Sequence, residues 1–316
     1  MDASPRLIDV ELPPPPWEIS TGTAPTPMEA LGGEFAIATD LKGRYLTAVK
    51  GGGRATDAIH TDAVQPRAWE RFKFWVDTAT GQYYAFQTVN GHFITANNAG
   101  GLNTNTVFTT ATSVGGWEMF KVLPQSKFST WAMQTLRGFF LTAVGGGGHD
   151  SGDTIHTDAV SAAEWEQFKL FRRSDFGTRS TYGIQAWGGN VINPWLTATS
   201  GGRLSSGGLT SGGGPPFWIS WTLLKQDDGT YALQTASGAV LTAIGGGVPG
   251  EGFRTDTEPD QIGNWEKFTL VDNGDFTAYI KTHAGTYVTA SVDSDAVTTV
   301  TNVNQATRWR FWVFGL

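Results

Sequence analysis

The chain has 316 residues, enough for one large domain or two modest ones, each with its own core. Its formal net charge is −7 and its longest basic run is the pair Arg172-Arg173, so the sequence lacks the electrostatic footprint of a nucleic-acid-binding protein. Cysteine is absent, which excludes disulfides, thiolate zinc sites and a cysteine nucleophile.

The N-terminal segment, residues 1–32, is rich in proline and includes the run Pro13 to Pro16. Proline favours an extended conformation, so we expect a tail or a strap along the surface, with a ligand for an aromatic groove as the alternative. Neither a signal peptide nor a run of roughly 18 apolar residues occurs. These features predict a soluble chain without membrane insertion, either cytoplasmic or released without a leader.

The rest of the chain repeats one pattern: an apolar stretch, a turn with glycine, Thr-Ala, a Gly-rich loop, a polar strand and a Trp-x-x-aromatic motif. The repeated Thr-Ala pairs begin at Thr47, Thr95, Thr142, Thr197, Thr242 and Thr289. They define six units, numbered one to six: 35–77, 82–123, 129–173, 181–224, 230–271 and 276–316. The step from Thr142 to Thr197 is longer than the others and contains a charged stretch, 172–180, that we interpret as a linker.

The 41 glycines and 13 tryptophans suit short strands joined by tight turns, and each unit contains about four runs of strand character. We therefore predict an all-β chain of two tandem β-trefoils, 33–174 and 175–316, each built from three four-stranded repeats. The alternative is a six-bladed β-propeller, which also uses four strands in a unit of this length. A connector halfway round the ring disfavours the propeller.

The segments "GRYLTA", the Gly-rich loop and "WExFxL" resemble fascin-type β-trefoil repeats, and more closely the fascin-like modules attached to secreted glycoside hydrolases and lectins. The resemblance covers roughly residues 35 to 316. It implies a non-catalytic binding module, because fascin bundles actin with four trefoils and its glycan-binding relatives hold sugars at up to three equivalent sites. This chain has two predicted trefoils and no basic surface, which weakens the actin interpretation.

A Trp-Glu pair stands near the end of four units. In "WEQFKLF", Phe168 and Leu170 share a parity and should face the core, which puts Glu166 on their side and Trp165 on the other. One interpretation is structural: the glutamates accept hydrogen bonds from loop N–H groups or a nearby hydroxyl, and the tryptophans pack under their hairpins. The other is a sugar site in which the indole stacks on the sugar and the carboxylate accepts from its hydroxyls. The candidate residues are Trp69, Glu70, Trp117, Glu118, Trp165, Glu166, Trp265 and Glu266.

The strand after the Gly-rich loop supplies a second candidate feature. Asp62, Asp158 and Asp256 recur at one position, each two residues after His60, His156 or Arg254. Alternation places each pair on one strand face, as a solvated face or as the polar edge of a sugar pocket. The loop glycines permit a tight hairpin and could let a ligand approach the backbone.

These patterns favour a multivalent lectin without a catalytic residue, metal or cofactor. Metal sites need three or four converging ligands, and no hydrolase or nucleotide-binding motif occurs. We expect sugar sites in units one, two, three and five, with glycans or polysaccharide as partners. Unit four, with Ile219, and unit six, with Arg310, lack the glutamate and should be degraded. The alternative function is a fascin-like structural or actin- or protein-interaction module.

Overall fold

Strands and short 3-10 turns make up the regular structure of this chain. The computed structural model describes residues 27–177, 180–188, 194–212 and 214–316, and within these ranges it contains no α-helix. The run Pro13 to Pro16 lies outside the described residues. The chain is therefore all-β, as its composition predicts.

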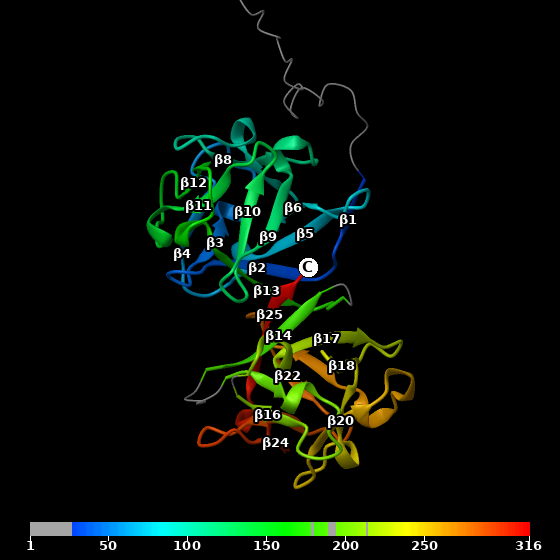
Figure 1. Cartoon of the computed structure of the whole chain (residues 1–316). Coiled ribbons are helices and arrows are strands. Elements are labelled where there is room, and N and C mark those ends of the chain that lie inside the picture. The colour runs from blue at the N-terminus through cyan, green and yellow to red at the C-terminus, as the bar shows by residue number, and fades with distance from the viewer. Residues whose placement is uncertain (1–26, 178–179, 189–193, 213) are drawn as a thin grey trace, which may run out of the picture.

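Units one to three form the first lobe (Figure 1). Its strands are β2 (Glu34–Thr39), β3 (Tyr45–Ala48), β4 (Ile59–Ala63), β5 (Phe72–Asp77), β6 (Tyr83–Thr88), β7 (Phe93–Ala96), β8 (Val107–Ala111), β9 (Phe120–Pro124), β10 (Trp131–Thr135), β11 (Phe140–Ala143), β12 (Ile155–Ala159) and β13 (Phe168–Arg173). Strands β2, β5, β6, β9, β10 and β13 pair in that order, and β13 pairs back with β2. The ring is therefore closed, and the hairpins β3–β4, β7–β8 and β11–β12 lie outside it.

Units four to six form the second lobe in the same way. Its strands are β14 (Thr181–Trp187), β15 (Leu196–Ala198), β16 (Leu209–Ser211), β17 (Ser220–Lys225), β18 (Tyr231–Thr235), β19 (Val240–Ala243), β20 (Phe253–Thr257), β21 (Thr269–Asp272), β22 (Thr277–Lys281), β23 (Tyr287–Ala290), β24 (Val297–Val300) and β25 (Arg308–Gly315). The ring runs β14, β17, β18, β21, β22, β25 and back to β14, with the β18–β21 step made by the bridge from Tyr231 to Phe268. Each unit thus supplies four strands.

Hydrogen bonds between a Gly-rich loop of one unit and a strand of another unit close each lobe on itself. In the first lobe, a loop N–H donates to a strand carbonyl of the next unit, and unit three returns to unit one. These bonds are Gly53 N to Thr109 O (2.7 Å), Gly101 N to Thr157 O (2.6 Å) and Gly148 N to Thr61 O (2.6 Å). In the second lobe, Arg203 N donates to Thr255 O, and the return from unit six to unit four uses Ser211 N and Asp295 O.

Side chains of alternating residues fill the two rings. Phe168 and Leu170 are fully buried, as their parity predicts, and equivalent positions hold Phe72 and Phe74 in unit one. In units four and six the first of these positions holds a tryptophan, Trp221 or Trp309. Both indoles are fully buried and donate through Nε1 to a backbone carbonyl, that of Leu196 or Val288.

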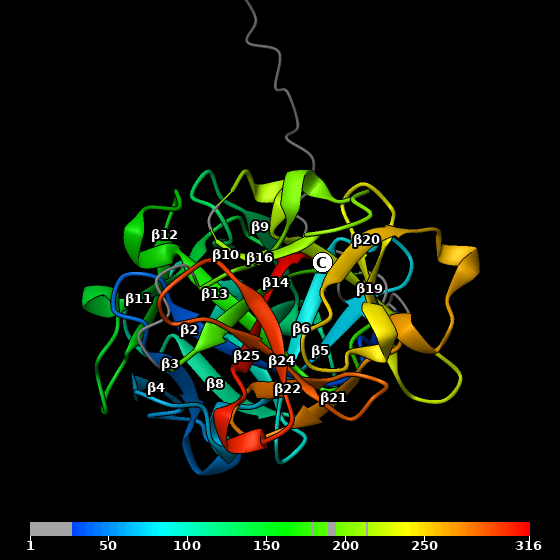
Figure 2. The same ribbon diagram turned by 90° about the horizontal axis from the view of Figure 1, so that it is seen from below.

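The two lobes lie end to end and share a junction (Figures 1 and 2). Strand β13 pairs with β25 there, and Arg310 Nη1 donates to the hydroxyl of Tyr45 at 2.8 Å. Burial lowers the pKa of Arg310 to about 10. The linker expected over 172–180 begins later than its first residue, because Arg172 and Arg173 still belong to β13.

The end of the predicted tail forms a short strand. Strand β1 (Met28–Ala30) pairs antiparallel with β5, with Met28 opposite Asp77. This part of the segment therefore lies along the first lobe, as expected of a strap.

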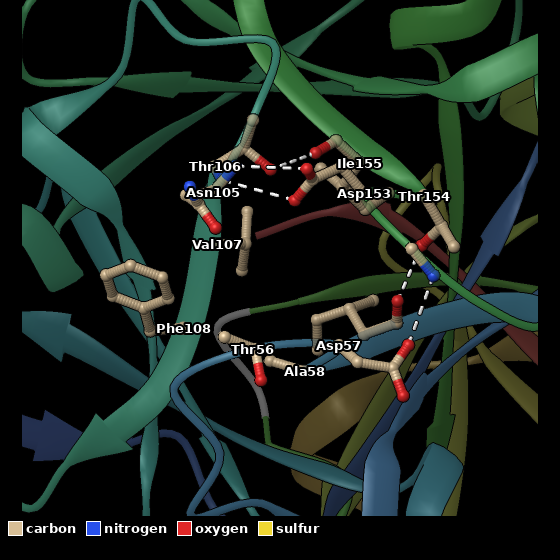
Figure 3. A pocket seen from close by; sticks show the side chains of 12 residues that line it. Thr56, Asp57, Ala58, Asn105, Thr106, Val107, Phe108, Asp153, Thr154 and Ile155 are labelled. Carbon is tan, nitrogen blue, oxygen red and sulfur yellow. Dashed lines mark hydrogen bonds between the residues drawn. The ribbon is translucent and has the colours of Figure 1, made fainter.

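A small cavity of about 20 Å³ marks where the three units of the first lobe meet (Figure 3). Thr154 Oγ1 donates to Ile59 O at 2.6 Å, and Thr106 Oγ1 donates to Ile155 O. The third equivalent position is Ala58, which cannot donate to the remaining carbonyl, that of Val107. Two of the three units therefore make this hydrogen bond, and the third, unit one, has the buried methyl group of Ala58 instead.

Replacing Ala58 with threonine should stabilise the protein. The new hydroxyl would occupy the cavity and donate to Val107 O, as Thr154 does to Ile59 O. A buried hydrogen bond contributes about 1 kcal/mol to the free energy of unfolding. Urea denaturation measures the change, and a lower midpoint for Ala58→Thr than for the parent chain would contradict this interpretation of the cavity.

Candidate functional site

The Trp-Glu pairs lie in 3-10 turns that precede a ring strand. The four turns are Ala68–Glu70, Gly116–Glu118, Glu164–Glu166 and Asn264–Glu266. The sequence predicted the pair within the strand, and this was wrong, because the strand begins two residues after the glutamate. The parity argument nevertheless placed the glutamate inward and the tryptophan outward, and the burial of both side chains agrees with it.

The four glutamates are buried and hydrogen-bonded. Glu70 Oε1 accepts from Thr47 Oγ1 at 2.7 Å, and its Oε2 accepts from the backbone N–H of Arg67 at 2.7 Å. Glu118 and Glu266 repeat both bonds with Thr95 or Thr242 and a loop N–H, and Glu166 accepts from Ala163 N at 2.8 Å. The side chains are 5 to 7% exposed. The structural interpretation therefore fits the carboxylates, whereas their contact with sugar hydroxyls stays a prediction.

The four tryptophans behave differently from the glutamates. Trp69, Trp117 and Trp165 are each 46% exposed, and Trp265 is 45% exposed. An indole that packs only as a core residue would be covered, so these four indoles pack against their own hairpins only in part. Each turn presents part of an aromatic face to solvent at an equivalent place.

In unit one, the exposed indole borders a hollow of about 700 Å³. The hollow lies between the end of β4 and the turn Ala68–Glu70, and its walls include Trp69, Asp62, His60 and Gln65. The structure thus brings together an aromatic surface, a carboxylate and an amide, which are the groups that recognise a polar ligand with an apolar face.

Of the two polar side chains of β4 that line the hollow, His60 has a hydrogen-bond partner and Asp62 has none among the described residues. His60 Nε2 lies 2.8 Å from Asp57 Oδ1, and this hydrogen bond is the main reason why the pKa of Asp57 lies below its ordinary value. Asp62 is exposed and makes no hydrogen bond or ion pair with a described residue. Its carboxylate is therefore available to a ligand in the hollow.

The equivalent aspartates of units three and five have different surroundings. Asp158 is exposed and, like Asp62, has no ion pair among the described residues. Asp256 Oδ1 lies 3.5 Å from Nε of Arg254, so its charge is partly neutralised. Burial of Ile59, Ile155 and Phe253 on the opposite strand face agrees with the predicted alternation.

The Gly-rich loops serve packing between units. Residues 50 to 53 all have positive φ, with 103° at Gly52, a region that favours glycine. A Cβ on Gly52 would lie 2.4 Å from Thr88 Oγ1 of the next unit. The backbone approach permitted by this glycine is therefore to the next unit, and a ligand contact at that position is not needed to explain it.

Units four and six depart from the pattern in two ways. In unit four, Ile219 is buried at the glutamate position, as expected, and Thr197 Oγ1 donates instead to the carbonyl of Gly212. In unit six, the sequence equated Trp309-Arg310 with a Trp-Glu pair, which is wrong. Trp309 takes the place of the buried ring phenylalanine, because it faces Ala278 as Phe72 faces Phe35.

Two further findings bear on other functions. Within the described ranges, no group of three or more His, Asp or Glu side chains could hold a metal ion. No helix of the described part of the chain has the length and hydrophobicity needed to cross a membrane.

Sequence reasoning missed several residues that build the site. The threonines of three Thr-Ala pairs, Thr47, Thr95 and Thr242, hold the glutamates, and the recurrence of Thr-Ala with a glutamate about 23 residues later was the available signal. Two further residues carried a signal that was not used: Asp57, which orients His60, recurs as Asp153 three residues before His156, and Gln65 in the wall of the hollow recurs as Gln261 four residues before Trp265.

Comparison with known proteins gives structural likeness only. No family model and no curated protein match the chain. The designed threefold-symmetric protein ThreeFoil is 14% identical, with a TM-score of 0.39, and the match covers 44% of this chain and 98% of that one. The Rhizoctonia solani agglutinin is 17% identical, with a TM-score of 0.37 and coverage of 48% and 100%. A mosquitocidal holotoxin is 10% identical, with a TM-score of 0.40, and this chain spans 34% of its length. These values assign neither a family nor a function.

Proposed function

We propose that the chain consists of two β-trefoils in tandem, 33–174 and 175–316, and binds carbohydrate without catalysing a reaction. The closed ring of six strands with three outer hairpins in each lobe supports the trefoil architecture. The return of unit three to unit one, through Gly148 and Thr61, also supports it, because a six-bladed ring would pass from unit three to unit four.

The observation that carries the binding proposal is the hollow of unit one. Its volume of about 700 Å³ is within the range of small-molecule sites, and it sets the half-exposed Trp69 beside the unpaired Asp62. The C–H face of a sugar ring stacks on an indole, and a carboxylate accepts hydrogen bonds from two neighbouring hydroxyls. The hollow therefore fits a neutral sugar.

Repetition supports more than one site in the chain. Trp117, Trp165 and Trp265 have the same exposure as Trp69, and Asp158 repeats the unpaired carboxylate of Asp62. Linked weak sites raise the avidity for a polysaccharide without new contacts. The buried glutamates take no part in this proposal except to fix the turn that carries each tryptophan.

A glycan array probed with the full chain tests the function, with sedimentation against filamentous actin as a parallel assay. Retention of a defined class of glycan, with no protein pelleted by the filaments, is the expected result. Filaments that pellet the protein, together with an array that retains none, would support the fascin-like alternative and overturn the lectin proposal.

A further inference from the structure

A second hollow, of about 410 Å³, lies beside the Trp-Glu turn of unit five. Its walls include Asn264, which precedes Trp265, together with Lys267, Lys281, His283 and Asp228. A Cβ on Gly246 would lie 3.4 Å from Trp265 Cδ1 and 3.6 Å from His283 Cδ2, so the indole and the imidazole flank the same glycine. The 45% exposed Trp265 therefore lies beside the hollow, although it is not part of its wall as Trp69 is in unit one.

Two basic residues of this hollow, Lys281 and His283, differ from the residues at the equivalent positions of other units. At the position of Lys281, three other units carry a glutamine whose amide donates to the glycine carbonyl of its own turn: Gln87, Gln134 and Gln234. His283 lies two residues after Lys281. At the equivalent position, units two and three have Val89 and Leu136. Two neutral positions of the scaffold are thus basic here, although packing in the other units does not require a basic residue.

The charges of this hollow do not cancel. Asp228 pairs with Lys267 at 2.8 Å, and this bond lowers the pKa of the Asp228 carboxyl. Lys281 makes no ion pair with a described carboxylate; its ammonium lies 5.8 Å from the centre of the Tyr287 ring. In a chain with a net charge of −7, the hollow keeps an unneutralised cation facing solvent.

We infer that this hollow binds an acidic sugar, whose carboxylate or sulfate group contacts Lys281 and His283 while its ring lies against Trp265. The inference rests on the proposed function, and it gives the second lobe a different ligand class from the first. In unit one the position of His283 is taken by the neutral Val89, next to Gly51, and the exposed charged side chains that line the hollow, Asp62 and Arg67, have opposite signs. An anion is therefore attracted to the unit-five hollow by an excess of positive charge that the unit-one hollow lacks.

The test is titration calorimetry of the full chain and of Lys281→Gln with three probes: tetragalacturonate, a heparin-derived tetrasaccharide and a neutral galactose tetrasaccharide. The substitution gives the glutamine that units two, three and five have and allows the turn hydrogen bond that they make, so folding should be preserved. Loss of a charge-assisted contact should weaken binding of one or both acidic probes about tenfold. The two acidic probes distinguish carboxylate from sulfate recognition.

Lys121→Gln is the matched control, because Lys121 also lies over a tyrosine ring, Tyr83, at 5.4 Å but belongs to the first lobe. It should leave acidic binding unchanged, whereas Trp265→Ala should weaken it. An acidic probe that does not bind, or binds equally to the parent and Lys281→Gln, overturns the inference. Acidic binding that survives Trp265→Ala also overturns it, since it would indicate a bare ion site. Neutral glycan binding that depends on Trp69 would leave the proposed function intact in each case.

Discussion

Replacing Trp69 with alanine should weaken glycan binding at the unit-one hollow by about 2 kcal/mol, or roughly thirtyfold in the dissociation constant. The indole is the aromatic wall of that hollow, and alanine removes the stacking surface. The free energy of unfolding should change little, because 46% of the side chain is already exposed. Titration calorimetry with a glycan selected on the array measures the first effect, and urea denaturation the second.

Phe217→Ala is the control for Trp69→Ala. Phe217 is an exposed aromatic residue in the turn of unit four, where the glutamate position holds the buried Ile219. We expect its removal to leave affinity unchanged. If Trp69→Ala binds as tightly as the parent chain but unfolds much more easily, the indole is a packing residue and the binding site lies elsewhere.

Replacing Glu70 with alanine should have the opposite effect and destabilise the first lobe by about 3 kcal/mol. Thr47 Oγ1 and the N–H of Arg67 would both lose their acceptor inside the turn. A buried polar group without a partner costs about 1 to 3 kcal/mol. The drop in the urea midpoint measures this cost.

Asp62→Ala is the comparison for Glu70→Ala, because Asp62 is exposed and unpaired among the described residues. Its removal should change stability by no more than about 0.5 kcal/mol and should weaken sugar binding. A Glu70→Ala chain of parental stability that has lost its affinity would contradict the structural role assigned to the glutamate.

The repeated part of the architecture could be predicted from the sequence, because each unit confirms the others. Alternation in "WEQFKLF" identified Phe168 and Leu170 as core residues and Glu166 as an inward carboxylate. The error in unit six has a physical cause. Trp-x-x-Trp has the spacing of Trp-x-x-Phe, but Trp309 fills the ring position that phenylalanine fills elsewhere. Only strand register, which depends on pairing with β22, distinguishes the two alignments.

Contacts that occur once could not be predicted. Arg310 donates to Tyr45 across 265 residues of sequence, and no repeated pattern indicates that pairing. The outward side of Trp69 could be predicted from alternation, but the extent of its exposure could not. It depends on how a 3-10 turn replaces the first residues of an expected strand, and turn geometry of this sort follows from the buried Glu70 bonds.

The most direct test of the central claim is the indole N–H spectrum of the full chain during titration with an array-selected neutral glycan. The chain has 13 tryptophans, and the signal missing from the Trp69→Ala spectrum identifies Trp69. We predict that this signal shifts progressively as the glycan is added and reaches a plateau at saturation. A glycan that binds while the Trp69 signal stays in place would contradict the site proposed in unit one.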